Sequence, residues 1–189
     1  MFRYLAVFLA AITLSACTER YRMASYDKPT VQLDRQSSFY VTLPADGRHG
    51  AGSSYNGSAA NTARAISDAL LTHVDKTVIG TVKGETLEEA MARAKQDGLG
   101  YVFQTTILNW EDRLNLLSGR PDRFTLQFAV YDVLSGQEIS SAISSATGKG
   151  GPITMGNPSK LLPEPVKTFV DPLFQPAAAT TATTAAKAP

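Results

Sequence analysis

Apolar and polar side chains alternate in several short segments of the chain, and this alternation predicts β-strands. Residues 39–43 form the first of them, with three apolar side chains on one face and Pro44 directly after. Further strands are predicted over 77–82, 101–110, 124–130 and 139–147. The segment 101–110 has β-forming residues on both faces, which is typical of a central strand. The last segment is more polar, which favours a place near a sheet edge.

Two segments between these strands have the spacing of amphipathic helices. A helix is predicted over 58–74, with Ser58 as its N-terminal cap. Its apolar residues recur at helical spacing: Ala63, Ile66, Leu70 and Val74. Thr86 and Glu89 have the spacing of a capping box, so a second helix is expected to begin here and to end near Gly98.

The order of these elements defines the fold class. Two strand–helix–strand units come first, and such units imply right-handed crossovers between parallel strands. Two further strands follow, joined by a tight turn at Ser135-Gly136, and a terminal helix interrupted by prolines is expected over 159–174. The chain is therefore predicted to be an α/β protein with α+β-like features. It has a mixed sheet of about five strands, two crossover helices and a C-terminal helix.

This topology also places the long loops. Residues 46–57, 111–123 and 148–158 are rich in glycine or charge, and all three segments are expected at the same end of the sheet. We call this end the three-loop rim. Ligands of open α/β sheets bind at the carboxyl ends of the strands, so the rim is the expected binding surface.

The first seventeen residues have the organisation of a bacterial lipoprotein signal peptide. A short start with Arg3 precedes the uncharged run 5–16, which is too short to cross a bilayer core of roughly 30 Å as a helix. The run ends in Leu14-Ser15-Ala16-Cys17, which resembles a lipobox. We therefore expect cleavage before Cys17 and acylation of that residue, for example with palmitate. Thr18 is not the aspartate that retains many lipoproteins in the inner membrane, which favours the periplasmic face of the outer membrane.

These signals divide the chain into expected parts. They are a signal peptide over 1–16, a lipidated tether over 17–38 with at most a short strand near 30–33, a single α/β domain over 39–174 and a disordered tail over 175–189. The tail contains only Gln, Pro, Ala, Thr and one Lys, so it has no core-forming residue larger than Ala.

Charge and cysteine content exclude several classes of function. The chain has 18 basic and 17 acidic residues, and cleavage removes Arg3, so the mature chain is neutral overall. This balance argues against nucleic-acid binding and against a polybasic membrane-surface binder. Cys17 is the only cysteine, so neither a disulfide nor a CxxC metal or redox site can form within the chain. No cofactor is expected.

Recognised catalytic motifs are incomplete. Tyr55 stands where a dinucleotide fingerprint beginning at Gly50 needs its third glycine, and no lysine follows Gly57 as a P-loop requires. Glycines that allow a tight passage from strand to helix are the favoured interpretation. His49 and His73 are the only histidines, and they lack a metal-binding spacing.

The segment around the sole tryptophan, Trp110, is the most distinctive, because it carries both signs of charge at a strand end. Two interpretations stand side by side. The tryptophan packs on the core while Asp112 or Asp122 pairs with an arginine to fix the loop, or the segment is a recognition surface in which an aromatic anchor and arginines supply binding energy. The candidate binding residues are Tyr55, Trp110, Asp112, Arg113, Arg120, Asp122 and Arg123.

Several sequence blocks resemble one family. These are the lipobox, Tyr55-Asn56-Gly57-Ser58, the blocks 110–113 and 118–123, Asn157-Pro158 and Leu161-Leu162-Pro163-Glu164-Pro165. Over residues 39–174 they are similar to a bacterial lipoprotein family known only as domain of unknown function 4823. The resemblance implies a lipoprotein with one α/β domain and transfers no activity. The element order is also similar to small periplasmic domains of envelope-assembly lipoproteins such as the curli secretion lipoprotein, as a fold-level analogy.

Three functional hypotheses follow. The first is a non-enzymatic outer-membrane lipoprotein that binds an envelope protein or glycan partner through the rim. The second is a hydrolase or glycan-acting enzyme that uses Asp46, Asp112 or Asp122. The third is an oligomeric structural or secretion component. The identity of the partner and the oligomeric state are left open by the sequence.

Overall fold

A mixed six-stranded sheet forms the centre of the protein, with the strand order β1-β8-β7-β6-β2-β5. The structure is a computed structural model that describes residues 19–49, 53–112, 120–149 and 157–175. The strands of the sheet are β1 Arg20–Asp27, β2 Ser38–Leu43, β5 Lys76–Lys83, β6 Tyr101–Glu111, β7 Arg123–Asp132 and β8 Glu138–Thr147. Two short strands, β3 Arg48–His49 and β4 Ser53–Ser54, pair with each other beside it.

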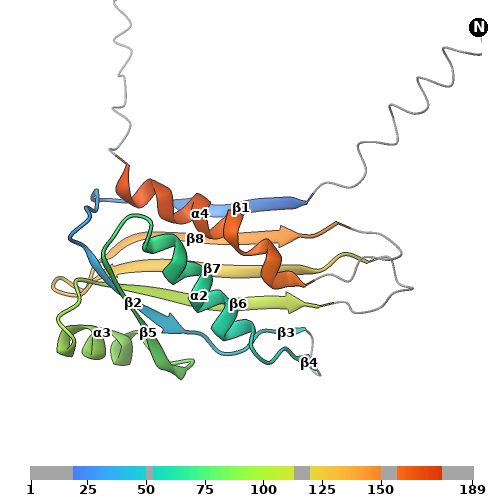
Figure 1. Cartoon of the computed structure of the whole chain (residues 1–189), viewed down its shortest axis with the longest axis horizontal. Helices are drawn as coiled ribbons and strands as arrows, with labels where there is room; N and C mark the ends of the chain where they lie inside the picture. The colour runs from blue at the N-terminus through green and yellow to red at the C-terminus, as the bar shows by residue number, and fades with distance from the viewer. Residues whose placement is uncertain (1–18, 50–52, 113–119, 150–156, 176–189) are drawn as a thin grey trace, which may run out of the picture.

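Helices cover both faces of this sheet, although unequally. They are α2 Ser58–Leu70, α3 Leu87–Gln96 and α4 Pro163–Val170, and the 3-10 turns η2 Pro158–Leu161 and η3 Asp171–Phe174 flank α4. Figure 1 shows α2 and α4 lying along one face. Phe39, Val41 and Phe103 belong to the large core on that face, whereas their chain neighbours Tyr40 and Val102 pack with α3. Successive strand residues point to opposite faces, so α3 covers the other side of β2 and β6.

The sequence pattern predicts much of this architecture correctly. The predicted apolar face of the first helix is buried throughout, from Ala63 to Val74. The capping box is present, with the Thr86 hydroxyl accepting a hydrogen bond from the Glu89 N–H and the Glu89 carboxylate accepting one from the Thr86 N–H at 2.8 Å. β2 is parallel to β5 and β6, and β6, β7 and β8 form an antiparallel meander. The predicted mixed α/β class is confirmed, with six strands in the sheet.

The main difference lies in the segment predicted as a tether. The pattern predicts no strand before residue 30, but Arg20–Asp27 forms β1, which pairs antiparallel with β8. The described residues 30–33 form no strand. β1 escapes detection because a bulge between Met23 and Ser25 breaks its period of two. Only Met23 and Tyr26 of this edge strand pack against the core, so a polar composition suffices.

Two helix boundaries also differ. α2 ends at Leu70 instead of residue 74, although Val74 remains buried. The predicted terminal helix is divided, because Pro163 occupies the first turn of α4 and Pro172 the first turn of η3. Proline is tolerated in a first turn because its missing N–H has no partner there in any case. The predicted signal peptide, Cys17 and the tail 176–189 lie outside the described residues.

Phe169 joins α4 to the sheet. Its ring centroid lies 5.6 Å from that of Phe103 and 5.3 Å from that of Phe128, and its side chain is fully buried. Tyr26 of β1 contacts the same ring edge-on at 6.4 Å. This side chain of α4 therefore packs on aromatic residues of three strands, β1, β6 and β7.

We expect Phe169→Ala to lower the free energy of unfolding by about 3–5 kcal/mol, because it removes a large buried side chain and leaves a cavity. Denaturant unfolding measures this loss. Leu134, which is 96% exposed in the β7–β8 turn, provides the matched control, and Leu134→Ala should change stability by less than about 0.5 kcal/mol. A small effect of Phe169→Ala would contradict the assigned packing.

Candidate functional site: the three-loop rim

The strand topology brings the described ends of the three loops to one end of the sheet, as predicted. Glu111 at the end of β6 is opposite Arg123 at the start of β7, and Arg123 is opposite Thr147 at the end of β8. The short strand β3 packs against β6 at the same end. Arg20 is also opposite Thr147, so β1 starts at the rim as well.

Trp110 is part of the core beneath the rim. Its side chain is 2% exposed and stacks on Phe124, with ring centroids 5.6 Å apart and an interplanar angle of 17°. Gly47 lies so close to Trp110 that no Cβ could be added there without displacing the indole. Trp110 therefore closes the core under the loop that follows β2. Its burial supports the packing interpretation, because an exposed aromatic anchor would have to be presented to solvent.

A buried carboxylate organises the outer side of the rim. The Glu111 side chain is 2% exposed, and its Oε1 accepts hydrogen bonds from Arg123 Nε at 2.5 Å and Asn109 Nδ2 at 3.1 Å. His49 Nδ1 lies 3.2 Å from the same oxygen. A buried carboxylate is costly unless it is paired and hydrogen-bonded, so these partners hold β3, β6 and β7 together. Sequence reasoning missed Glu111 and His49, although a correct β6–β7 register would have placed Glu111 opposite Arg123.

Asp112 and Asp122 lie where the chain leaves β6 and approaches β7. Burial raises the pKa of the Asp112 carboxyl, and the nearby negative charge of Asp122 raises it further. Oδ1 of Asp112 is buried and has no hydrogen-bond partner among the described residues. Asp122 is also buried, and its carbonyl accepts a hydrogen bond from Gly148 N–H at 2.8 Å, which links two of the loops. Arg120 is exposed, and Arg113 lies outside the described residues.

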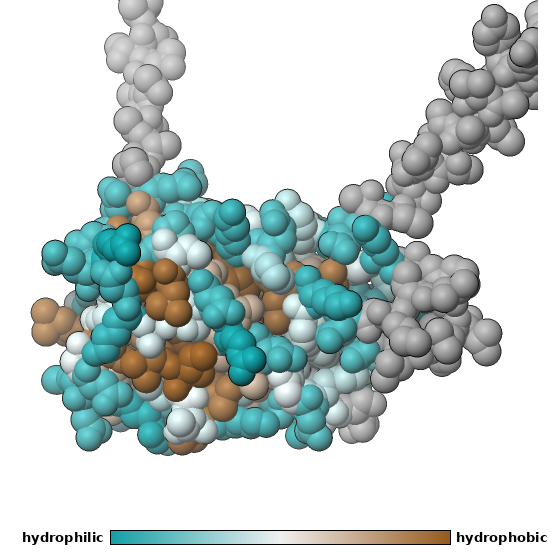
Figure 2. Space-filling model, in the orientation of Figure 1, coloured by the Kyte–Doolittle hydropathy of each residue, from teal (hydrophilic) through white to brown (hydrophobic). Residues whose placement is uncertain are grey.

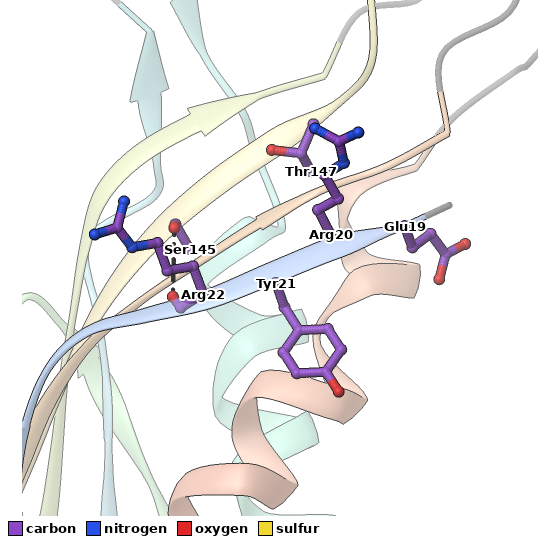
Figure 3. A pocket seen from close by; sticks show the side chains of 6 residues that line it. All are labelled: Glu19, Arg20, Tyr21, Arg22, Ser145 and Thr147. Atoms are coloured by element: carbon purple, nitrogen blue, oxygen red, sulfur yellow. Dashed lines mark hydrogen bonds between the residues drawn. The ribbon is translucent and has the colours of Figure 1, made fainter. Parts of the chain in front are cut away.

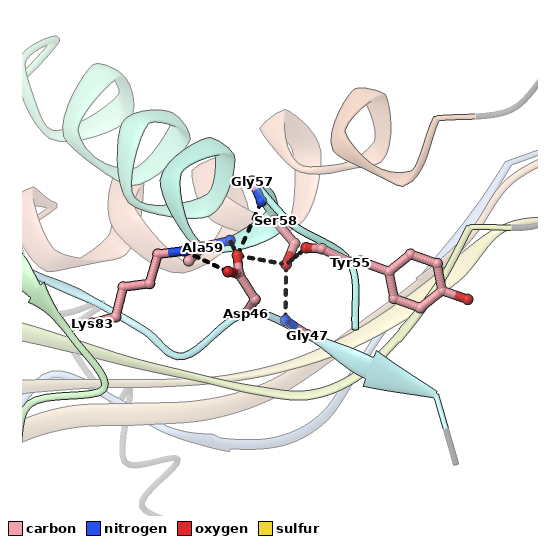
Figure 4. A network of polar contacts seen from close by, with 7 residues as sticks. All are labelled: Asp46, Gly47, Tyr55, Gly57, Ser58, Ala59 and Lys83. Carbon is pink, nitrogen blue, oxygen red and sulfur yellow. Dashed lines mark hydrogen bonds and ion pairs between the residues drawn. The ribbon is translucent and has the colours of Figure 1, made fainter. Parts of the chain in front are cut away.

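Asp46 caps helix α2 from a distance (Figure 4). The residue at the N-cap is Gly57, with φ of 90°, and it has no side chain to offer. Asp46 Oδ1 accepts hydrogen bonds from the N–H groups of Gly57 and Ala59, both at 3.1 Å, while Oδ2 binds Lys83 Nζ at 2.5 Å. Ser58 is thus the first helical residue and not the predicted cap. Its hydroxyl donates to the Tyr55 carbonyl and accepts from Gly47 N–H.

The electrostatics of Asp46 follow from these bonds. Burial alone would raise the pKa of its carboxyl, but the hydrogen bond from Lys83 and those from the backbone of Ala59 and Gly57 outweigh burial and lower it. The Tyr55 ring points away from this network, as Figure 4 shows, and packs partly against the core. Asp46 and Tyr55 therefore serve mainly to fix the loop after β2 onto α2.

The titratable groups that the structure describes form no metal centre at the rim. Within the described ranges, no group of three or more His, Cys, Asp or Glu side chains could hold a metal ion. His73 lies at the opposite end, where its Nε2 is 2.9 Å from Asp171 Oδ1 and its ring stacks on Phe174.

No helix of the described residues is long and apolar enough to cross a membrane. Figure 2 shows the larger apolar areas of the visible face toward the end opposite the rim.

Residues 31–173 match the family model of a domain of unknown function, DUF4823, and the chain belongs to this family. A sequence search of the curated proteins gives no significant match. Among solved structures, the chain is similar to PelC from Paraburkholderia phytofirmans, described as a dodecamer, with a TM-score of 0.62 and 14% identity over 85% of this chain and 100% of that chain. A PelC variant dodecamer in another space group gives a TM-score of 0.57 and 16% identity over 82% and 98% of the two chains. At these identities the likeness shows a shared fold.

We expect Trp110→Ala to lower the free energy of unfolding by about 3–5 kcal/mol, since it empties a buried site next to Phe124. Trp110→Phe should cost less, because a ring remains stacked there. Chemical denaturation reports both values, and the fluorescence of wild-type Trp110 should shift to the red on unfolding. Unchanged stability in Trp110→Ala, with a selective loss of partner binding, would instead favour the recognition interpretation.

Asp46→Ala is expected to destabilise the protein by about 1–2 kcal/mol at neutral pH, because α2 loses its cap. The pKa of Asp46 is lowered in the folded state, so its contribution is present above the ordinary value of 3.8 and is lost as the pH falls through the folded value. The difference between wild type and Asp46→Ala should therefore shrink on acidification below about pH 4.

Unfolding at several pH values measures this effect. Asp68→Ala, on the exposed face of α2, serves as the control and should leave stability within about 0.5 kcal/mol at every pH. An Asp46→Ala deficit that is equally large at neutral and strongly acidic pH would show that the carboxylate does not act through its charge.

Proposed function

We propose that this protein is a lipid-anchored, non-enzymatic assembly module of the bacterial envelope. Acylated Cys17 holds it to the periplasmic face of the outer membrane, as the lipobox and Thr18 indicate. Several acyl chains on one residue give a stable anchor, since each buried methylene contributes about 0.8 kcal/mol. The α/β domain then acts beside that membrane by binding other envelope molecules.

The observation that favours a module over an enzyme is the use of the rim carboxylates. Asp46 is bonded to helix N–H groups and Lys83, and buried Glu111 is bonded to Arg123 and Asn109. A catalytic acid or base must reach a substrate atom within hydrogen-bonding distance. Carboxylates whose oxygens already hold the loops in place are poorly suited to that role.

Self-association is the form of assembly that the fold favours. The sheet is open, with β1 and β5 as its two edge strands. Each of them pairs with one strand within the sheet, so its outer edge can pair with another chain. The fold covers the whole of the PelC chain, and PelC is described as a dodecamer. We propose that this chain also forms a closed homo-oligomer, since head-to-tail contacts close into rings when the rotation permits.

One observation supports the alternative of a glycan-acting hydrolase. Burial and Asp122 raise the pKa of Asp112, which favours a protonated acid next to a second carboxyl group. Glycosidases use such pairs, with one acid protonating the leaving oxygen. This alternative requires that both side chains be reached by a sugar, whereas Asp122 is buried.

Light scattering of the mature lipoprotein in detergent should give a protein mass that is a multiple of the single-chain mass. In cells, the wild type should incorporate palmitate, and Cys17→Ser should abolish this incorporation and cleavage before residue 17. Both effects follow from a lipid anchor and an assembling domain.

A wild-type particle of one chain would contradict the oligomer, and equal palmitate incorporation by wild type and Cys17→Ser would contradict the anchor. Release of reducing ends from envelope glycans by the wild type, but not by Asp112→Asn, would replace the proposal with the hydrolase. We expect no such release.

A further inference from the structure

The membrane anchor and the folded domain are separated by very little chain. β1 begins at Arg20, so only Thr18 and Glu19 lie between it and Cys17. Three residue steps of fully extended chain span at most about 11 Å. If Cys17 is acylated as proposed above, the first residue of β1 is held within about that distance of the lipid headgroups. The short connection therefore restricts which end of the domain meets the membrane.

The end that β1 selects is the three-loop rim. Arg20 is opposite Thr147, and Thr147 is opposite Arg123. The start of β1 therefore lies at the rim, next to the last residue of β8 and near the first residue of β7. Figure 1 shows that β1 begins at the end where β6 and β8 finish, whereas α4 leads to the opposite end. If Cys17 is acylated, the rim is therefore the end of the domain that lies nearest the membrane surface.

Exposed basic side chains gather at the rim end. Those described are Arg20, Arg22, Arg48, Arg120, Arg123, Lys149 and Lys160, and Glu19 and Glu164 are exposed acids near them. The rim also holds the carboxylates of Asp46, Glu111, Asp112 and Asp122, which are half-buried or buried. The opposite end carries both signs of exposed charge, with Lys28, Arg35, Lys76 and Lys95 beside Asp27, Asp75, Asp97 and Glu138. The exposed surface next to the start of β1 is therefore basic.

An open groove of about 610 Å³ lies directly beside the first residues of β1 (Figure 3). Arg20 and Arg22 are opposite Thr147 and Ser145, so these two guanidinium groups and two hydroxyls share one face of the sheet. Tyr21 points to the other face, as Figure 3 shows, and it is 53% exposed. Guanidinium groups match phosphate oxygens in geometry and charge, and the Thr147 hydroxyl can donate to the same oxygens. The Ser145 hydroxyl instead donates to the Arg22 carbonyl at 3.4 Å, and Glu19 also lines the groove.

We infer that the rim end docks on the membrane that carries Cys17, and that the groove beside Arg20 and Arg22 binds the phosphates of anionic phospholipid headgroups. The described rim surface is mainly hydrophilic on the face shown in Figure 2, so the contact is with headgroups and not with acyl chains. Each basic residue near an anionic surface contributes about 1 kcal/mol, or about five-fold in affinity.

The orientation is tested on the acylated protein in vesicles that contain a headgroup-attached fluorescence quencher. Because Cys17 is the only cysteine and is acylated, a second cysteine can be labelled selectively. A fluorophore at Ser54→Cys, on exposed β4 at the rim, should be quenched. The same fluorophore at Leu134→Cys, in the exposed turn at the opposite end, should not be quenched. Equal quenching, or stronger quenching at residue 134, would overturn the orientation.

The headgroup site is tested separately with the mature chain carrying Cys17→Ser, which binds vesicles without acyl chains. Its affinity should be higher for phosphatidylcholine vesicles that contain phosphatidylglycerol than for phosphatidylcholine alone. Arg20→Gln with Arg22→Gln should lower this affinity by about 25-fold, at about five-fold per charge. The control Lys28→Gln with Lys76→Gln removes two positive charges at the opposite end and should leave the affinity unchanged.

Equal affinity of the wild type for both vesicles, or equal losses in the two double variants, would refute the headgroup site. Matching thermal unfolding of the two variants confirms that both are folded. Competition by inorganic phosphate at low concentration would show an ion site without lipid preference and would also refute it. A chain that is not acylated in cells would overturn the proposed anchor instead, and the vesicle affinities would distinguish that result from failure of the site.

Discussion

The rest of the structure depends on the pairing of β1 with β8, because it places the first described residues beside the three-loop rim. The ladder runs from Arg20 opposite Thr147 to Asp27 opposite Ser141. It covers an edge of the meander, brings Tyr26 against Phe169 and places the start of β1 at the rim. Without this strand the first backbone contact with the sheet would be the hydrogen bond from Thr30 N–H to the Ile139 carbonyl.

The second constraint is the need to satisfy buried charge at the rim. Glu111 and Asp46 are removed from most solvent, and each is stabilised by a cation and by additional hydrogen bonds. Removing a partner from such a buried charge costs more than the pair contributes, so these networks act mainly to fix loop positions. Carboxylates in glycine-rich or charged loops suggest chemistry when read in the sequence. In this fold, Asp46 and Glu111 instead hold the long connections in place against the sheet and α2.

Local and periodic signals made the crossover helices and the parallel strands predictable. The capping box at Thr86 and the apolar face of α2 depend on residues a few positions apart, so they are visible in one sequence. β1 was not predictable in this way, because its bulge disrupts the alternation and its pairing partner is more than a hundred residues away. The packing of Trp110 on Phe124 likewise depends on register. Of the candidate site, the clustering of the loops was predictable from strand order. The sequence also offered packing of Trp110 on the core, but it did not decide between that and a recognition surface, and it gave no role to Glu111.

The distribution of charge is also a property that the sequence alone does not give. A balance of 17 basic and 17 acidic residues over 17–189 does not say where the charges lie, and only the fold places Arg20 and Arg22 together at the rim. If the rim faces the membrane, the strands point toward the lipid and the edges β1 and β5 face sideways. Contacts between chains through these edges would then spread parallel to the membrane and keep every rim, with its Arg20 and Arg22, on the lipid surface. Lipid docking and ring formation would therefore reinforce each other, because each additional chain in the ring adds an anchor and another Arg20–Arg22 pair to the same surface.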